Sequence, residues 1–377
     1  MRLWALLNAA KNRAPRILGA VFCVSTLLAI SACGKKQSTP EWDTPGTATP
    51  AGPSATSQAP ASPAVVTPAA REVPRVPIKE TPPAVTESAP TPEGAADAVA
   101  TAPAEGLRFM TYNVENWLTM DRYVEGKNLK GAPKPENEKQ AVIKILTRQI
   151  PDVIGICEIG AATDLAEIQE KLKAAGLDLP HSHYTGGVDP TRHLGLLSRF
   201  PITSTAKPAE TEYQLEGQTF AINRGILDAS IQARGKSYRF VGIHLKSKRD
   251  SEQGDQEAIR LNEARLLRRH VNSILGSDPD ARLIVYGDFN DTRATPAIKA
   301  ITGNYNDPTY LTAIPAKDSH DDAWTHHWAL HDIYSRIDFI MVSRGIRSDV
   351  DFHEEKIIDD ADWEKASDHR AVLAVFK

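Results

Sequence analysis

The chain of 377 residues contains 44 lysine and arginine residues against 48 aspartate and glutamate residues, and 41% of it is hydrophobic. This composition is typical of a globular protein and argues against a wholly disordered or fibrous chain. Residues 106–377 carry 35 basic and 40 acidic side chains, which argues against a module that only binds nucleic-acid phosphates but not against an enzyme that uses a metal ion.

Residues 1–32 have the organisation of a secretory signal peptide. Four basic residues and no acidic one lie among the first 16 residues, and an apolar run follows over residues 17–30. This run is shorter than the ~20 apolar residues of a membrane-spanning helix. We therefore expect it to direct export.

The end of this signal, Leu-Ala-Ile-Ser-Ala-Cys at residues 28–33, resembles a bacterial lipobox. The resemblance implies cleavage before Cys33 and attachment of lipid to its thiol, which would anchor the protein to the periplasmic or outer face of the cell envelope. An ordinary cleaved signal peptide with a coincidental cysteine is the alternative.

Residues 33–105 are predicted to form a disordered tether. Of the 26 prolines in the chain, 14 fall within residues 34–105, among alanine, threonine, serine and glutamate. A stretch of this composition buries too little apolar surface to offset the entropy lost on ordering. The globular domain is therefore expected to span residues 106–377.

That domain alternates between strand and helix patterns. Apolar residues at helical spacing predict helices over residues 137–150, 163–175 and 255–275. The arginines of the third helix, at positions 260, 265, 268 and 269, are expected on a solvated face. Short apolar or alternating runs predict strands at 107–113, 153–157, 194–198, 225–233, 238–245, 282–286, 336–342 and 371–376. These elements predict a layered α/β or α+β domain.

Residues capable of chemistry stand where these predicted strands begin or end. They are Asn113, Glu158, His244, Asp288 with Asn290, Asp338, and Asp368 with His369. Each alone has an ordinary explanation, because an aspartate or asparagine after a strand is usually a turn residue. Their recurrence at successive strands favours a shared functional site.

In this order, together with the segments Gly-Asp-Phe-Asn (287–290) and Ser-Asp-His (367–369), these residues resemble the endonuclease/exonuclease/phosphatase superfamily. The resemblance covers residues 107–376. It implies an α+β fold, a four-layer α/β/β/α sandwich of two packed mixed sheets flanked by helices, as in deoxyribonuclease I. The active site would then lie at one end of the sandwich.

The resemblance also implies roles for individual residues. Glu158 would ligate a divalent metal with Asn113 nearby, and Asp368 would support the metal or the histidines. Asp288 and Asn290 would position the attacking water and the phosphate, and Asp338 would orient His369. His244 resembles the second catalytic histidine of the nuclease and sphingomyelinase branches. Arg224 matches a phosphate-binding arginine of the family more loosely; the role of Glu115, near the metal in some relatives, stays open. Lys246 is a candidate phosphate-binding residue because of its own position two residues after His244.

Physical chemistry supports these roles independently. Phosphodiester cleavage requires compensation of the negative charge that develops on the phosphoryl oxygens. Carboxylate and amide oxygens suit Mg²⁺, with Mn²⁺ possible. Two histidines on opposite sides of a phosphate can handle the protons of the nucleophile and of the leaving group.

Three further features have two interpretations each. Lys246, Lys248 and Arg249 could hold a second phosphate or form a solvated loop. Trp324 and Trp328 could stack on a base or a headgroup, or one of them could pack in the core. A further set of histidines, at positions 181, 183 and 193, fits no closed tetrahedral zinc spacing, which favours a structural or surface role.

The sequence thus predicts a monomeric, metal-dependent phosphoesterase whose leading activity is nuclease-type hydrolysis of DNA or RNA. The enzymatic alternative is a phospholipid or inositol-phosphate hydrolase, which a membrane anchor would suit. The non-enzymatic alternative is a binding protein on an inactive scaffold.

Overall fold

The computed structural model describes residues 105–124, 126–249 and 254–377. The predicted signal peptide (1–32), the predicted lipid-bearing Cys33 and residues 34–104 of the predicted tether lie outside the described residues. In the part of the chain that is described, no helix combines the length and the apolar character needed to cross a membrane.

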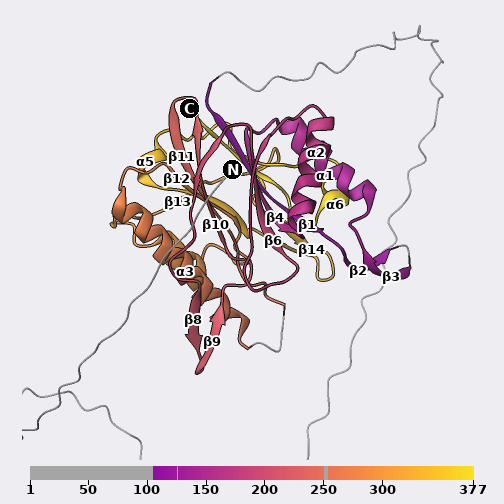
Figure 1. Cartoon of the computed structure of the whole chain (residues 1–377), viewed down its shortest axis with the longest axis horizontal. Helices are drawn as coiled ribbons and strands as arrows, with labels where there is room; N and C mark the ends of the chain where they lie inside the picture. Colours follow the sequence, from indigo (N-terminus) through magenta and orange to yellow (C-terminus); the bar gives the residue numbers. More distant parts are fainter. Residues whose placement is uncertain (1–104, 125, 250–253) are drawn as a thin grey trace, which may run out of the picture. The chain divides into compact units, whose positions relative to one another are not determined.

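Two six-stranded mixed sheets form the centre of the domain (Figure 1). The first contains, in spatial order, β17 (Lys356–Ile357), β18 (Val372–Phe376), β1 (Leu107–Trp117), β4 (Val153–Ile159), β6 (His193–Ser198) and β5 (His181–Thr185). The second contains β13 (Thr312–Ala313), β16 (Asp338–Val342), β12 (Leu283–Asp288), β11 (Lys236–His244), β10 (Ile226–Ala233) and β7 (Ile202–Thr205). Among the described residues, three two-stranded hairpins lie outside the sheets: β2–β3 (Met120–Val124, Lys127–Ala132), β8–β9 (Glu212–Leu215, Gln218–Ala221) and β14–β15 (His326–Trp328, Ile333–Ser335).

Helices cover the outer face of each sheet. The helices are α1 (Glu136–Gln149), α2 (Ala162–Ala174), α3 (Gln256–Ser277), α4 (Pro296–Thr302), α5 (Arg344–Arg347) and α6 (Trp363–Ala366). One hydrophobic cluster lies between the sheets, a second joins the first sheet to α1 and α2, and a third joins the second sheet to α3 and α4. The predicted four-layer α/β/β/α sandwich is therefore confirmed.

All the helices and strands predicted from the sequence are present, with small shifts at their ends. The helix predicted from residue 163 starts at Ala162, and Asp164 acts inside its first turn, where its carboxylate accepts the backbone N–H of Ala161 at 2.7 Å. The strand predicted from residue 336 starts at Asp338, and at this start the backbone N–H groups of Ile337 and Asp338 both donate to the Thr325 hydroxyl.

The prediction that the α3 arginines all face solvent is wrong for Arg260 and Arg268. Arg260 is 4% exposed, and its Nε lies 3.0 Å from a carboxylate oxygen of Asp291. Arg268 donates to the backbone carbonyls of Ile301 and Thr309. Burial of an arginine requires such partners for its five N–H donors, and here they join α3 to α4 and to the loops before and after α4.

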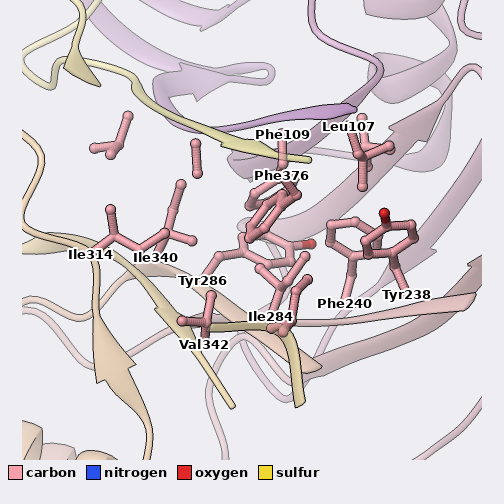
Figure 2. Packing of buried hydrophobic residues seen from close by; sticks show 14 of the residues in the cluster. Leu107, Phe109, Tyr238, Phe240, Ile284, Tyr286, Ile314, Ile340, Val342 and Phe376 are labelled. Carbon is pink, nitrogen blue, oxygen red and sulfur yellow. The ribbon is translucent and has the colours of Figure 1, made fainter. Parts of the chain in front are cut away.

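Tyr286 fills the centre of the cluster between the sheets (Figure 2). Its ring centroid lies 4.9 Å from that of Phe109 in an edge-to-face contact. Two glycines make room for it: a Cβ at Gly155 would stand 2.0 Å from the Tyr286 ring, and a Cβ at Gly242 would stand 2.6 Å from its hydroxyl oxygen. The two sheets can approach each other at this point because both positions lack a side chain.

We therefore expect Gly155→Ala to lower the free energy of unfolding by about 1–3 kcal/mol, the usual cost of overpacking a core. Urea denaturation of the purified protein measures this change. Gly276→Ala in α3 is the matched control, since nothing lies within 4 Å of its added methyl group and alanine is the better helix former by up to about 1 kcal/mol. Equal stability of the Gly155→Ala variant and the unmodified protein would contradict the packing argument.

Candidate active site

The strand register of the second sheet brings three of the predicted site residues together. His244, Asp288 and Asp338 are direct neighbours on adjacent strands: His244 of β11 pairs with Asp288 of β12, which pairs with Asp338 of β16. In the first sheet, Asn113 of β1 pairs with Cys157 of β4, so Glu158 follows at the same end. The edges of both sheets thus contribute to one site.

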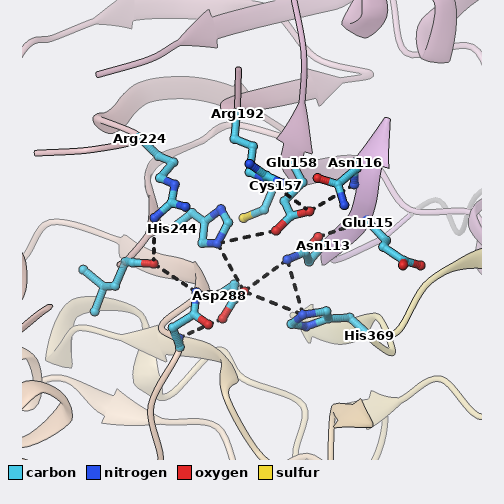
Figure 3. A network of polar contacts seen from close by, with 12 residues as sticks. Asn113, Glu115, Asn116, Cys157, Glu158, Arg192, Arg224, His244, Asp288 and His369 are labelled. Carbon is cyan, nitrogen blue, oxygen red and sulfur yellow. Dashed lines mark hydrogen bonds and ion pairs between the residues drawn. The ribbon is translucent and has the colours of Figure 1, made fainter. Parts of the chain in front are cut away.

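Asp288 lies at the centre of this site (Figure 3). Its Oδ2 accepts a hydrogen bond from Nδ2 of Asn113 at 3.1 Å. The same oxygen lies 3.4 Å from Nε2 of His244 and 3.7 Å from Nε2 of His369, so the two imidazoles approach one carboxylate from either side (Figure 3). Asn290 donates its backbone N–H to Oδ1 at 2.8 Å and its side-chain amide to the Leu245 carbonyl at 2.9 Å.

The two imidazoles differ in charge. Although burial opposes it, the carboxylates of Asp338 and Asp288 raise the pKa of His369 well above its usual range; Nδ1 of His369 lies 2.8 Å from the Asp338 carboxylate. Burial, helped by the charges of Arg224 and His369, lowers the pKa of His244 well below its usual range. At neutral pH the site therefore holds one charged and one neutral imidazole, which is the pairing that acid–base chemistry needs.

Burial is also the main cause that raises the pKa of Asp288, to about 7, with the Asp338 charge adding to it and the His369 charge opposing it. A carboxyl group with this pKa exchanges a proton near neutral pH. Asp288 is therefore chemically able to take part in proton transfer as well as in positioning.

The segment Ser367-Asp368-His369 is joined to β1 by hydrogen bonds. The Ser367 hydroxyl donates to the Asn113 carbonyl at 2.8 Å and accepts the backbone N–H of His369 at 3.0 Å. The carboxylate of Glu115 accepts the backbone N–H of Asp368 at 3.1 Å. Glu115, whose role the sequence left open, thus supports the loop that carries Asp368.

Glu158 and Asp368, two of the three metal-binding residues predicted from the sequence, form with Glu115 an acidic rim beside Asp288. Oε2 of Glu158 accepts the backbone N–H of Asn116 at 3.0 Å, and its carboxylate lies 3.8 Å from both Nε of Arg192 and Nε2 of His244. Burial first, and then the charges of Asp368 and Glu158, raise the pKa of Glu115 to about 7. This crowding of negative charge fits a site for a cation.

The donor atoms also fit Mg²⁺. In the described part of the chain, Glu158 belongs to no group of three histidine or carboxylate side chains whose ligand atoms lie close together. A metal ion at Glu158 would therefore be bound by this one carboxylate, the amide oxygen of Asn113 and water molecules. Mg²⁺ keeps several waters and binds through one or two carboxylates. A carboxylate oxygen of Asp368 lies 3.9 Å from Nε2 of His369, and Asp368 forms a group of possible ligands with His326 and His369.

The backbone is left-handed at four positions around this site. Glu115, Asn116, Glu158 and Asn290 have φ values of 46°, 57°, 66° and 49°. Residues other than glycine adopt this conformation at a cost of about 1–3 kcal/mol, and they persist there because surrounding contacts hold them. Strain of this kind concentrates at functional sites.

The predicted phosphate-binding residues lie beside His244. Arg224 is buried, with Nε 3.1 Å from a carboxylate oxygen of Asp189 and Nη1 donating to the Leu245 carbonyl at 3.4 Å. Burial, and then the charge of Arg224, lowers the pKa of Lys246. The buried carboxylate of Glu263 in α3 accepts backbone N–H groups from both Asn223 and Lys246. Glu263 therefore fixes both of the segments that carry the predicted phosphate-binding residues Arg224 and Lys246.

The structure distinguishes some of the alternatives that the sequence left open for the lysines after His244 and for the two tryptophans. Lys248 lies 3.0 Å from the Asp291 carboxylate, so its charge is engaged in an ion pair. Trp324 packs between the rings of Tyr334 and Trp363, with the Arg370 guanidinium 4.0 Å from its ring centroid, which agrees with the packing alternative. Trp328 on β14 is 46% exposed.

The histidines at positions 181, 183 and 193 lie on β5, an edge strand of the first sheet, and on its neighbour β6. Nδ1 of His193 lies 2.8 Å from the Gly160 carbonyl oxygen, and its ring contacts that of Tyr184. Within the described residues, no metal-type group includes any of the three. This agrees with the structural interpretation.

Sequence reasoning missed three residues of the site. Arg192 approaches Glu158, Asp189 pairs with Arg224, and His326 places its ring centroid 4.6 Å from that of His369. The only signal in the sequence concerned His326, and it was the pair of adjacent histidines in Thr-His-His-Trp (325–328).

Comparison with known proteins is consistent with this geometry. The sequence model of the endonuclease/exonuclease/phosphatase family matches residues 111–346. An endonuclease/exonuclease/phosphatase from Bacteroides vulgatus is similar in structure, with 18% identity, a TM-score of 0.52 and coverage of 72% of this chain and 99% of that chain. The catalytic domain of human Nocturnin with bound sulfate is similar at 18% identity and a TM-score of 0.52, over 72% of this chain and 94% of its own. No curated protein sequence gives a significant match.

Proposed function

Because the chain belongs to the endonuclease/exonuclease/phosphatase family, whose members hydrolyse phosphoester bonds, we propose that it is a divalent-metal-dependent phosphodiesterase that cleaves DNA or RNA. The observation that carries this proposal is the pair of imidazoles, one neutral and one charged, that face the single carboxylate of Asp288 beside an acidic rim.

The proposed reaction is attack of water on phosphorus. Asp288 and Asn290 orient the water, and the neutral imidazole of His244 accepts its proton as the new P–O bond forms. His369, held by Asp338, donates its proton to the oxygen that leaves as the other P–O bond breaks. Arg224 and Lys246 hold phosphoryl oxygens on the His244 side.

Mg²⁺ bound by Glu158 and Asn113 would offset the negative charge on the phosphoryl oxygens. Asp368 supports this side of the site through its contacts with Glu115 and the histidines. The exposed ring of Trp328 offers a stacking surface for a base, and such stacking is worth about 1–3 kcal/mol per base.

A phospholipid or small phosphoester is the second candidate substrate, favoured by a specific surface feature. The β14–β15 hairpin beside His369 exposes apolar side chains: Trp328, Leu330, Ile333 and Tyr334 are 46%, 81%, 46% and 49% exposed. Such a hairpin could enter the interface of a lipid bilayer, particularly in a protein held at a membrane by lipid.

A substrate panel separates these candidates. Plasmid DNA, RNA, sphingomyelin vesicles and inositol phosphates are each incubated with the protein and Mg²⁺, with and without chelator. We expect chelator-sensitive cleavage of DNA or RNA. Cleavage of sphingomyelin or inositol phosphates alone would establish the second candidate, and no cleavage by folded protein with Mg²⁺ or Mn²⁺ would favour the inactive-scaffold alternative.

The proposed cellular location is the bacterial envelope, with the catalytic domain tethered through residues 34–105 to lipid on Cys33. In cells fed radioactive fatty acid, we expect label on the mature protein and none on the Cys33→Ser variant. Label that persists in Cys33→Ser, or never appears on the unmodified protein, would contradict the anchor. Several acyl chains are expected to hold the protein stably, since each buried CH₂ adds ~0.8 kcal/mol.

A further inference from the structure

His326 lies against the histidine that the proposed mechanism uses as its acid. It belongs to β14, and an isolated antiparallel bridge pairs it with His369. The two ring centroids are 4.6 Å apart with the rings inclined at 51°. None of the roles assigned above uses His326.

Asp368 lies between these two imidazoles. One of its carboxylate oxygens is 3.8 Å from Nε2 of His326 and the other is 3.9 Å from Nε2 of His369. The ligand atoms of all three side chains lie within 4.8 Å of one another. Four ligands at 2.0–2.1 Å from a tetrahedral ion are about 3.4 Å apart, so small side-chain movements would close the set around one ion.

The backbone holds this group in place independently of any ligand. His327 donates its backbone N–H to the Asp368 carbonyl at 3.0 Å, and Arg370 donates to the Thr325 carbonyl at 2.7 Å. Hydrogen bonds on both sides of the His326–His369 bridge therefore fix β14 against the loop that carries Asp368. The group is preformed, which lowers the entropic cost of binding an ion.

A second observation points to metal binding. Nδ1 of His369 lies 2.8 Å from the Asp338 carboxylate, and histidines that ligate a metal usually pair their other ring nitrogen with a carboxylate or carbonyl oxygen. This contact leaves Nε2 of His369 as the nitrogen on the side of Asp368, at 3.9 Å, and of Asp288, at 3.7 Å. The side chains of His326 and Asp368 are 21% and 33% exposed, which leaves an approach for an ion and for one further ligand such as water.

We propose that His326, Asp368 and His369 form a binding site for Zn²⁺ and similar late transition-metal ions, and that an ion bound there inhibits the enzyme. Two imidazole nitrogens and one carboxylate oxygen suit Zn²⁺, Co²⁺ or Ni²⁺, whereas Mg²⁺ prefers oxygen ligands alone. The site is therefore chemically distinct from the oxygen-ligated one predicted at Glu158 and Asn113.

Inhibition follows from which nitrogen the ion would occupy, and this part of the inference rests on the proposed function. Nε2 of His369 is the atom that faces Asp288 and that donates the proton to the leaving oxygen. An ion on this nitrogen takes the place of its proton, which is released to solvent. The site would then lose its acid while its fold stays intact.

Binding is tested with Co²⁺ as a spectroscopic probe on the full-length protein, with Mg²⁺ in excess. We expect one Co²⁺ per chain with the visible absorption of a four-coordinate nitrogen–oxygen site, and displacement by Zn²⁺. His326→Phe, which removes one ligand but keeps a ring, is expected to weaken binding at least about tenfold.

His327→Phe is the matched control. His327 is the next residue on the same strand, but its ring stacks on that of Tyr334 with centroids 4.1 Å apart, and its Nε2 faces Asp332. A phenylalanine there keeps the stacking, so Co²⁺ affinity is expected to stay within twofold of the unmodified protein. Circular dichroism of each metal-free variant checks its folding, and Asp368→Asn provides a second ligand variant if His326→Phe fails to fold.

The outcomes are separable. Tight Co²⁺ binding that survives both His326→Phe and Asp368→Asn overturns the site. Binding that requires His326, together with Zn²⁺ inhibition of phosphodiester hydrolysis that His326→Phe weakens, supports the whole inference, whereas such binding without inhibition overturns the inhibitory role. If the unmodified protein hydrolyses no phosphoester, the proposed function fails, while the Co²⁺ spectra still decide whether the site exists.

Discussion

Replacing His369 with alanine is expected to reduce the turnover of bis-p-nitrophenyl phosphate by about 10²–10⁴-fold, the usual contribution of a positioned acid or base. His369 is the charged imidazole of the site, because Asp338 and Asp288 raise its pKa well above its usual range against the effect of burial. No other described imidazole combines this charge with a direct approach to Asp288, since His244 is neutral near pH 7. The measurement is kcat and kcat/KM with Mg²⁺ in excess.

Stability must be followed in the same experiment. Removing the imidazole leaves the buried Asp338 carboxylate without its partner at 2.8 Å, and an unpaired buried charge is destabilising. His369→Gln, which keeps a hydrogen-bond donor near Asp338, is therefore made alongside His369→Ala. His320→Ala is the control, because the side chain of His320 is 78% exposed and the proposed mechanism does not use it. Near-native turnover by a folded His369→Ala variant would show that the site assignment is wrong.

The positions of His244 and Asp288 were predictable because their signal is local. Each ends an apolar run whose length and composition indicate a buried strand, and parallel neighbouring strands end at the same edge of a sheet. The register confirms this, with His244 and Asp288 as direct partners. The sequence pattern thus predicted both strands, and their predicted ends, at residues 245 and 286, lie within two residues of the observed ends at His244 and Asp288.

Arg260 shows where the same reasoning fails. Helical periodicity gives the direction of its Cα–Cβ bond but not the path of a long side chain, and the partner that draws the guanidinium inward, Asp291, belongs to a separate segment. Asp189 is comparable: its importance depends on Arg224, 35 positions later in the chain. Pairings of this kind leave no pattern in the sequence around either residue.

His326 was missed for a related reason. It belongs to a strand of three residues, His326–Trp328, which is too short and too polar to show alternation. Its functional environment is created by a bridge to His369. Only the three-dimensional structure could place these two imidazoles side by side, and only their proximity makes Asp368 a shared neighbour.

The polar centre of the domain is stabilised by contacts that also prepare it for chemistry. Asn113 donates to Asp288 with its amide nitrogen and accepts the Glu115 backbone N–H with its amide oxygen. It thereby links the two sheets at the site and holds Glu115 in its left-handed conformation. Buried groups with partners of this kind are fixed before substrate arrives, so little reorganisation is left for the reaction itself.

Removal of divalent ions is expected to have an effect comparable to the loss of His369. Glu158, Glu115 and Asp368 concentrate negative charge at the rim, where burial and mutual repulsion raise the pKa of Glu115 to about 7. Without a cation, a phosphodiester anion would meet this charge unscreened. We expect excess chelator to reduce hydrolysis by about 10²–10³-fold or more, and added Mg²⁺ to restore it.

Glu158→Gln tests the residue behind this effect. A glutamine can still accept the Asn116 backbone N–H that Glu158 accepts at 3.0 Å, so the local backbone should persist while the ligand charge is lost. The Mg²⁺ concentration that gives half-maximal rate is expected to rise about tenfold or more. The Mg²⁺ concentration needed to raise the unfolding temperature is expected to rise by the same factor. Glu257→Gln, at an exposed position in the first turn of α3, should change neither. An unchanged Mg²⁺ response in Glu158→Gln would show that Glu158 is not a ligand of the cation. The carboxylates around Asp368 would then be its ligands.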